Sequence, residues 1–208
     1  MNTSWQELIA KLRSHPPYAA AFSRIYRSEP RRADVLDALG AFERSLVTPD
    51  ARFDRYLRGQ HEAITPDEER GYELFKTYGC TACHQGVNVG GNLFQRFGIF
   101  HDPFDDPPLS VADLGRFAIT RRPSDRHVFR VPSLRNAAVT APYFHDGRAR
   151  TLTEAVQEMA RSQLGRPLTD EHIDLIIKFL RTLTGEYNGK PLSDQAEGKP
   201  QREARRRR

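Results

Sequence analysis

The feature that most constrains this chain is the segment Cys80-Thr81-Ala82-Cys83-His84. Two thiols separated by two residues and followed directly by a histidine form the C-x-x-C-H pattern, which attaches a c-type haem. Each thiol can bond one vinyl group of the same porphyrin, and His84 is then placed to ligate the iron from one side. The sequence therefore predicts one covalent haem c, a pocket around it and a second axial ligand.

Two other uses of a C-x-x-C pair fit the surrounding sequence less well. A thioredoxin-like pair should follow a strand in a βαβ unit, whereas a helical pattern precedes Cys80. A zinc site needs further Cys or His ligands at short spacing, and Cys80 and Cys83 are the only cysteines in the chain. The same count argues against a disulfide framework.

Apolar residues at helical spacing predict an all-α fold. Three amphipathic segments come first, beginning at the Ser4 cap, and further helices begin at Thr65, Thr151 and Thr169. Gly71 lies in the helix that leads into the motif. It either lets another helix approach closely or is an ordinary helical glycine.

The segments between these helices are expected to be irregular. Residues 52–63 are polar and read as a connection, and Gly185 is expected to end the last helix. Residues 85–130 are rich in Gly and Pro, which predicts loops rather than a sheet. Loops this long are usually wrapped around something, and a haem would provide that surface.

The second iron ligand has few candidates. Met1 and Met159 are the only methionines, and we interpret Met159 as the distal ligand, although a Met on an apolar helical face is more often core. His145 is the main rival. Met/His ligation raises the reduction potential and blocks small molecules from the iron, which suits electron transfer. Arg130 and Arg135 are either partners of haem propionates or surface arginines.

Charge and hydropathy restrict the partners and the compartment. The formal net charge is +5, but the chain ends in Arg205–Arg208, so the remainder is nearly balanced and predicts no nucleic-acid partner. The chain contains no run of about 18 apolar residues, so the sequence predicts no membrane span. Attachment of haem c outside the cytoplasmic membrane predicts a periplasmic protein, yet Met1 begins no signal sequence. We therefore expect the true N-terminus to lie upstream of Met1.

Several motifs in the same order resemble the C-terminal half of bacterial di-haem cytochrome c peroxidases. They are Gly71–Phe75, Cys80–Gly86, Phe129–Asn136, Thr140–Gly147 and Thr151–Met159. The resemblance implies an electron-transfer haem with His84 and Met159 as its axial ligands. It also implies a calcium ion between two haem domains, bound by the backbone carbonyls of Thr140 and Pro142 and by a third ligand from the other domain.

The resemblance also implies that a domain is missing. In the family, the peroxidatic haem, its own C-x-x-C-H and the catalytic Glu precede the region present here, and Met1 resembles a Met just after that Glu. Residues 1–48 are then flanking helices from a second, missing cytochrome c domain. Residues 49–186 form the cytochrome c-like electron-transfer domain, and residues 187–208 a basic C-terminal tail. We interpret the chain as a fragment, or as a gene model started at an internal Met.

The expected function is to relay electrons from a small donor protein, a cytochrome c or a cupredoxin, to a peroxidatic haem that reduces hydrogen peroxide. No catalytic residue is assigned in this chain, so whether it is itself an enzyme is left open. The resemblance implies a homodimer for the full-length form. The alternative is a free-standing mono-haem electron carrier, which predicts that the first three helices expose no apolar face.

Overall fold

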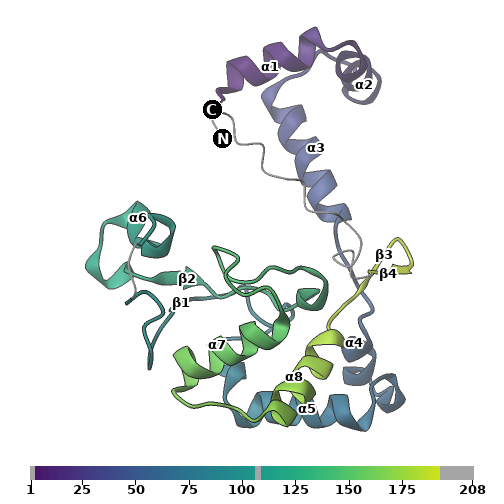
Figure 1. Cartoon of the computed structure of the whole chain (residues 1–208). Coiled ribbons are helices and arrows are strands. Elements are labelled where there is room, and N and C mark those ends of the chain that lie inside the picture. The colour runs from purple at the N-terminus through teal and green to yellow at the C-terminus, as the bar shows by residue number, and fades with distance from the viewer. Residues whose placement is uncertain (1–2, 106–108, 193–208) are drawn as a thin grey trace. The chain divides into compact units, whose positions relative to one another are not determined.

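The computed structural model describes residues 3–105 and 109–192. It divides into two compact units, residues 1–47 and residues 48–208 (Figure 1). The predicted all-α class is confirmed, because helices form most of the described structure and strands occur there only as two short pairs. Met1 and the Arg205–Arg208 tail lie outside the described residues.

The first unit consists of the three predicted helices, α1 (Trp5–Ser14), α2 (Pro16–Tyr26) and α3 (Arg32–Ser45). The predicted cap of α1 is confirmed: the Glu7 amide donates to Ser4 Oγ (3.2 Å), and the Ser4 amide donates to the Glu7 carboxylate (3.0 Å). Pro16 then begins α2, where its missing N–H costs nothing. Large side chains of this unit remain exposed, including Ile25 (64%) and Phe42 (58%).

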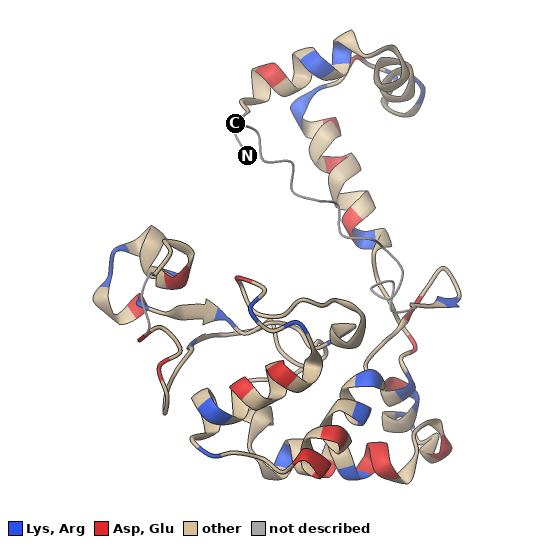
Figure 2. Ribbon diagram, in the orientation of Figure 1, with Lys and Arg blue, Asp and Glu red and all other residues tan. Residues whose placement is uncertain are grey.

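The second unit holds the remaining elements in chain order. Its helices are α4 (Arg52–Leu57), α5 (Pro66–Thr77), α6 (Phe117–Thr120), α7 (Leu152–Leu164) and α8 (Asp170–Arg181). Two antiparallel pairs join β1 (Phe94–Arg96) to β2 (Val128–Arg130), with Gln95 opposite Phe129, and β3 (Glu186–Tyr187) to β4 (Lys190–Pro191). Acidic and basic residues both occur along α1, α3, α5 and α8, in line with the nearly balanced charge of the body of the chain (Figure 2).

The core of the second unit forms where α5 crosses α8. A Cβ atom on Gly71 would lie 2.0 Å from the backbone oxygen of Leu175, so only glycine allows this approach. Of the two interpretations of Gly71, close helix packing is therefore confirmed. The aromatic rings of Phe75 and Phe179 meet beside this contact at 5.2 Å between centroids. Further buried apolar residues complete the cluster: Phe53, Leu74, Val89, Ile176, Leu180 and Leu183.

Two predictions around this core are wrong. Residues 52–63 are not merely connective, because they contain α4, whose Phe53 is only 5% exposed and enters the core. Asp54 also stabilises the first turn of α4 by accepting the Ala51 amide at 3.2 Å. Gly185 does not end α8, which stops at Arg181. Gly185 is instead required because a Cβ there would lie 2.1 Å from the Thr48 backbone oxygen.

The long segment after the motif is mostly loop, as predicted, but it does contain the β1–β2 pair. It also has an aromatic cluster of its own. Phe104 stacks on the His127 ring at 4.4 Å between centroids and meets Phe97 edge-on at 5.8 Å. Phe129 stacks on His145 at 4.6 Å, and Phe97 on Phe144 at 5.3 Å. These loops therefore pack on protein side chains, and their wrapping around a haem stays a prediction.

The contact at Gly71 gives a direct test of this packing. We expect Gly71→Ala to destabilise the second unit by about 3 kcal/mol, because the new methyl group overlaps a backbone carbonyl that cannot move alone. The measurement is urea unfolding of the full chain, followed by far-UV circular dichroism and by absorbance of the bound haem.

A matched control is Gly40→Ala in α3. Its Cβ would meet only the flexible Arg44 side chain, at 3.2 Å. This substitution should be neutral or stabilise by up to about 1 kcal/mol, since alanine favours helices over glycine. Equal effects of the two substitutions would contradict the packing argument.

Candidate haem site

The C-x-x-C-H segment forms a 3-10 turn, Cys80–Ala82, directly after α5. Gly79 permits this change of direction because its φ is 82°, in the left-handed region. Cys80 and Cys83 are both free and partly buried. Burial raises the pKa of the Cys80 thiol to about 11, so it is held as a neutral thiol in apolar surroundings. Both sulfurs are therefore free for covalent attachment.

The His84 imidazole is held in a neutral form. Burial lowers its pKa below the usual value, while backbone groups of Val89 and Pro132 act in the opposite direction. Its Nδ1 atom is buried and makes no hydrogen bond of acceptable geometry within the described residues. A Cβ on Gly90 would lie 2.1 Å from the Pro132 oxygen and 3.2 Å from His84 Nδ1. Position 90 therefore needs a glycine, because any side chain there would collide with the backbone of Pro132.

These observations fit a haem c. The site offers two free thiols and a neutral imidazole, which is the form of histidine that ligates iron. The orphaned Nδ1 lies beside the backbone of Val89 and Pro132, which can orient the ring from behind. Cys80, Cys83 and His84 are therefore the residues that would hold the group, as the sequence predicts.

The loop that follows His84 is fastened by the segment that contains Pro132. The Gly91 amide donates to the Val131 oxygen (2.8 Å), and the Leu134 amide donates to the Val89 oxygen (3.2 Å). The Ser133 hydroxyl donates to the Asn88 oxygen at 2.8 Å. Residues 88–91 are thus hydrogen-bonded to residues 131–134, which fixes the backbone next to the imidazole.

Arg135 is the strongest of these ties. It donates both Nη atoms to the two oxygens of Asp54, at 2.8 and 2.6 Å, and donates Nε and Nη2 to the Val87 oxygen, each at 2.9 Å. Arg135 thereby joins α4 to the loop after the motif, and most of its donors are used within the protein. Arg130 donates Nε to the Gly91 oxygen at 2.7 Å and is otherwise exposed, so it keeps more capacity for a propionate.

Met159 lies on α7, where it is partly buried. The predicted cap of this helix is confirmed, because the Glu154 amide donates to Thr151 Oγ1 at 3.1 Å. Leu152 and Val156 of the same helix pack on the core cluster, and Cys80 packs on that cluster as well. The haem turn and the Met159 helix therefore border one apolar core, and ligation by Met159 stays a prediction.

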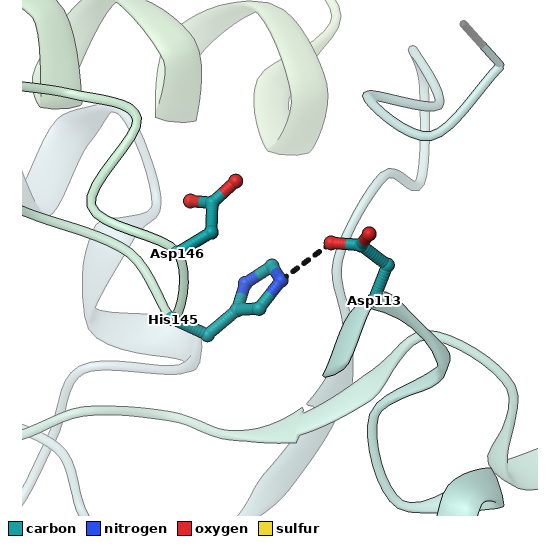
Figure 3. Close-up of side chains that lie close together, drawn as sticks. All are labelled: Asp113, His145 and Asp146. Carbon is teal, nitrogen blue, oxygen red and sulfur yellow. Dashed lines mark hydrogen bonds and ion pairs between the residues drawn. The ribbon is translucent and has the colours of Figure 1, made fainter. Parts of the chain in front are cut away.

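His145, the rival ligand, is engaged elsewhere. Figure 3 shows its ring directed at Asp113, with His145 Nε2 2.7 Å from Asp113 Oδ1. This hydrogen bond is the main reason that the pKa of Asp113 falls to about 2. Asp113, His145 and Asp146 each place one ligand atom within 4.8 Å of the others. Arg148 already binds this group, with Nε 2.6 Å from Asp146 and Nη2 3.6 Å from Asp113, so its charge opposes a cation.

Thr140 and Pro142 occupy an exposed turn before α7. Thr140 Oγ1 donates to the Asn136 oxygen at 3.3 Å, which orients the residue. Neither the Thr140 nor the Pro142 carbonyl accepts a hydrogen bond from the part of the chain that the structure describes. Both oxygens are thus free for a ligand, and their assignment to calcium stays a prediction.

Two residues that support the site were not found from the sequence. Asp54 binds Arg135. The only sequence pattern that could have marked Asp54 is an acid in the first turn of a helix, and that helix, α4, was missed because its sequence is polar. Gln163 binds the loop after β1 through its side chain, and no sequence pattern marks it. Both act through partners more than 60 residues away in the chain.

Comparison with known proteins places the chain in a family. Residues 68–184 match the cytochrome c family, and they include the haem turn and α5 to α8 apart from the first residues of α5. This part of the chain is a c-type cytochrome domain, whose prosthetic group is haem c. Residues 1–62 match the family described as di-haem cytochrome c peroxidase. The chain belongs to the di-haem cytochrome c peroxidase family.

Three curated relatives illustrate the similarity. Cytochrome c peroxidase Ccp of Escherichia coli is 41% identical over 88% of this chain and 39% of its own length. Cytochrome c551 peroxidase of Nitrosomonas europaea is 42% identical over 83% of this chain and 51% of its own length. The cytochrome c551 peroxidase of Pseudomonas aeruginosa is 38% identical over 96% of this chain and 60% of its own length. The chain thus spans from about two fifths to three fifths of these relatives.

A solved structure shows the same fold. The crystal structure of a MauG-like protein associated with microbial copper homeostasis matches with a TM-score of 0.72 and 28% identity. The match covers 89% of this chain and 63% of that one. Among residues 3–105 and 109–192, no helix has the length and hydropathy needed to cross a membrane.

The Arg135–Asp54 pair can be tested against an exposed pair of the same kind. The side chains of Arg135 and Asp54 are 18% and 20% exposed, so removing one partner leaves the other poorly solvated. We expect Asp54→Asn to lower the free energy of unfolding by about 2 kcal/mol, with a coupling to Arg135→Leu above about 1 kcal/mol in a double-mutant cycle.

The control is the Arg58–Asp50 pair, whose side chains are 55% and 59% exposed. The same cycle there should give less than about 1 kcal/mol, because water screens the interaction. Urea unfolding of the haem-loaded chain measures both cycles. A coupling at Arg135 no larger than that at Arg58 would contradict the role of the buried pair.

Proposed function

We propose that this chain carries the electron-transfer haem of a di-haem cytochrome c peroxidase. It accepts electrons one at a time from a small donor protein, a cytochrome c or a cupredoxin, and passes them to a peroxidatic haem that reduces hydrogen peroxide. The observation that carries the proposal is the haem turn itself, where two free thiols and a neutral, buried imidazole lie together in a member of this family. When bound, the haem supplies a one-electron iron couple.

Each residue has a defined task in this proposal. Cys80 and Cys83 would hold the porphyrin covalently, and His84 would ligate the iron while its Nδ1 lies near Pro132. Met159, on a helix that borders the same core, would supply the second protein ligand. Ligation of the iron by both His84 and Met159 would exclude peroxide and would raise the reduction potential.

The first three helices favour the proposal that this chain works beside a second haem domain, and they argue against a free-standing electron carrier. A free-standing carrier predicts no exposed apolar face there. Yet Leu39 (50%), Phe42 (58%) and Ile25 (64%) are exposed, and residues 1–62 match the di-haem peroxidase family. We propose that this face packs on the peroxidatic domain, that the full-length form is a periplasmic homodimer, and that Thr140 and Pro142 contribute carbonyls to a calcium site between the domains.

The proposal is tested with the haem-loaded 208-residue chain. Stopped-flow mixing with a reduced donor cytochrome c should show rapid one-electron transfer to the chain. A steady-state assay with hydrogen peroxide and the same donor should show no turnover above that of free donor. Efficient peroxide reduction by this chain would contradict the assignment of its haem to electron transfer.

Replacement of Met159 tests the second ligand. Met159→Ala should lower the reduction potential by more than about 100 mV, since loss of the thioether removes the ligand that favours ferrous iron. The ferric protein should also bind added cyanide or imidazole, which a six-coordinate haem resists. Potentiometry and absorption spectroscopy measure both effects.

The matched variant is Met159→Leu, which keeps the volume of the side chain and removes only the sulfur. It should behave like Met159→Ala if ligation matters, and like the unaltered protein if Met159 only fills space. Unchanged spectra for both variants would remove Met159 from the site.

A further inference from the structure

The side chain of Gln163 holds a loop onto the C-terminal end of α7. Its Oε1 accepts the amides of Gly98 (3.0 Å) and Ile99 (3.2 Å), and its Nε2 donates to the Arg96 oxygen (3.0 Å). One glutamine thus makes three hydrogen bonds to the backbone of residues 96–99, a segment more than 60 positions earlier in the chain.

The backbone beside Gln163 adds to this attachment. The Ser162 oxygen accepts the amides of Ile99 and Phe100, each at 3.0 Å. Ser162 is fully buried, with 0% exposure, so these bonds are shielded from water. The loop therefore satisfies a carbonyl at the end of α7 that the helix cannot satisfy itself.

The shape of the loop fits this contact closely. Gly98 has φ 87°, and a Cβ there would lie 2.6 Å from the Pro103 ring. Gly165, which ends α7 with φ 67°, lies against Phe100, where a Cβ would come within 2.7 Å of that ring. Two glycines thus let the chain close on the helix end, and the attachment has little room to slide.

Met159 lies four residues before Gln163, one helical turn along the same face of α7. The N-terminal half of the helix is held by Leu152 and Val156 on the core. Gln163 and Ser162 hold the other end, so Met159 lies between two fixed points. A thioether is a weak, neutral ligand, and its occupancy of the iron depends on how closely the protein holds it in place.

We propose that Gln163 is a positioning residue that keeps Met159 on the iron. The inference rests on the proposed function, because it requires Met159 to be the distal ligand. A looser C-terminal end of α7 then lets the Met159 thioether dissociate from the iron more often. The iron becomes accessible to small ligands even though Met159 itself is still present. Gln163 itself touches neither iron nor substrate in this proposal.

The test compares three variants of the haem-loaded full chain. Gln163→Leu removes all three hydrogen bonds at similar size, and Gln163→Asn keeps the amide but shortens its reach by one methylene. Gln157→Leu is the matched control, because Gln157 is an exposed glutamine of the same helix. Far-UV circular dichroism establishes that each variant is folded, and Gln163→Asn carries the test if Gln163→Leu does not fold.

The readouts are the methionine–iron charge-transfer band of the ferric protein and the rate at which imidazole binds to ferric haem. We expect Gln163→Leu to weaken the band and to raise the rate at least about tenfold, with Gln163→Asn between it and the unaltered protein. Gln157→Leu should change neither. A folded Gln163→Leu or Gln163→Asn variant with the original band and rate would overturn the inference.

Met159→Ala, measured in parallel, separates the two proposals. If Met159→Ala abolishes the band and the Gln163 variants leave it intact, the positioning role fails and the proposed function stands. If Met159→Ala leaves the band unchanged, Met159 is not the ligand, and both the assigned coordination and the role of Gln163 are overturned.

Discussion

The second unit depends on the contact in which α5 meets α8 without a side chain between them. At Gly71 the two backbones lie too close for a side chain, because a Cβ there would be 2.0 Å from the Leu175 oxygen. Two further contacts fix the register of the pair: Lys178 binds Asp67 at 2.8 Å, and the Tyr78 hydroxyl lies 2.6 Å from His172 Nδ1. Because α5 runs directly into the Cys80 turn, this register also sets where the thiols lie.

Around this helix pair, the loop after His84 and the helix that carries Met159 are each attached to a distant part of the chain. The loop after His84 is tied to residues 131–135, and the end of Met159's helix is tied to residues 96–100. Both attachments use backbone amides and carbonyls, with one side chain, Arg135 or Gln163, making several bonds at once. The two sides of the site are therefore positioned by separate networks that share only the apolar core.

Local chemistry explains what the sequence predicted well. The caps at Ser4, Thr65 and Thr151 depend on residues within a few positions of one another, and they were predicted correctly. The features that were missed depend on distant partners: α4 owes its burial to α8, and Gly185 is required by Thr48. Gly71 stayed open between two interpretations because a glycine gives no sign of what packs against it.

The backbone of Val87 is fixed by hydrogen bonds, whereas its side chain is exposed to solvent. Its carbonyl accepts two N–H groups from Arg135, while its side chain is 84% exposed beside the haem turn. Backbone position and surface chemistry are thus set independently at this residue. A substitution of this side chain would therefore change the surface beside the haem turn, while the backbone contact with Arg135 that holds the loop after His84 would remain.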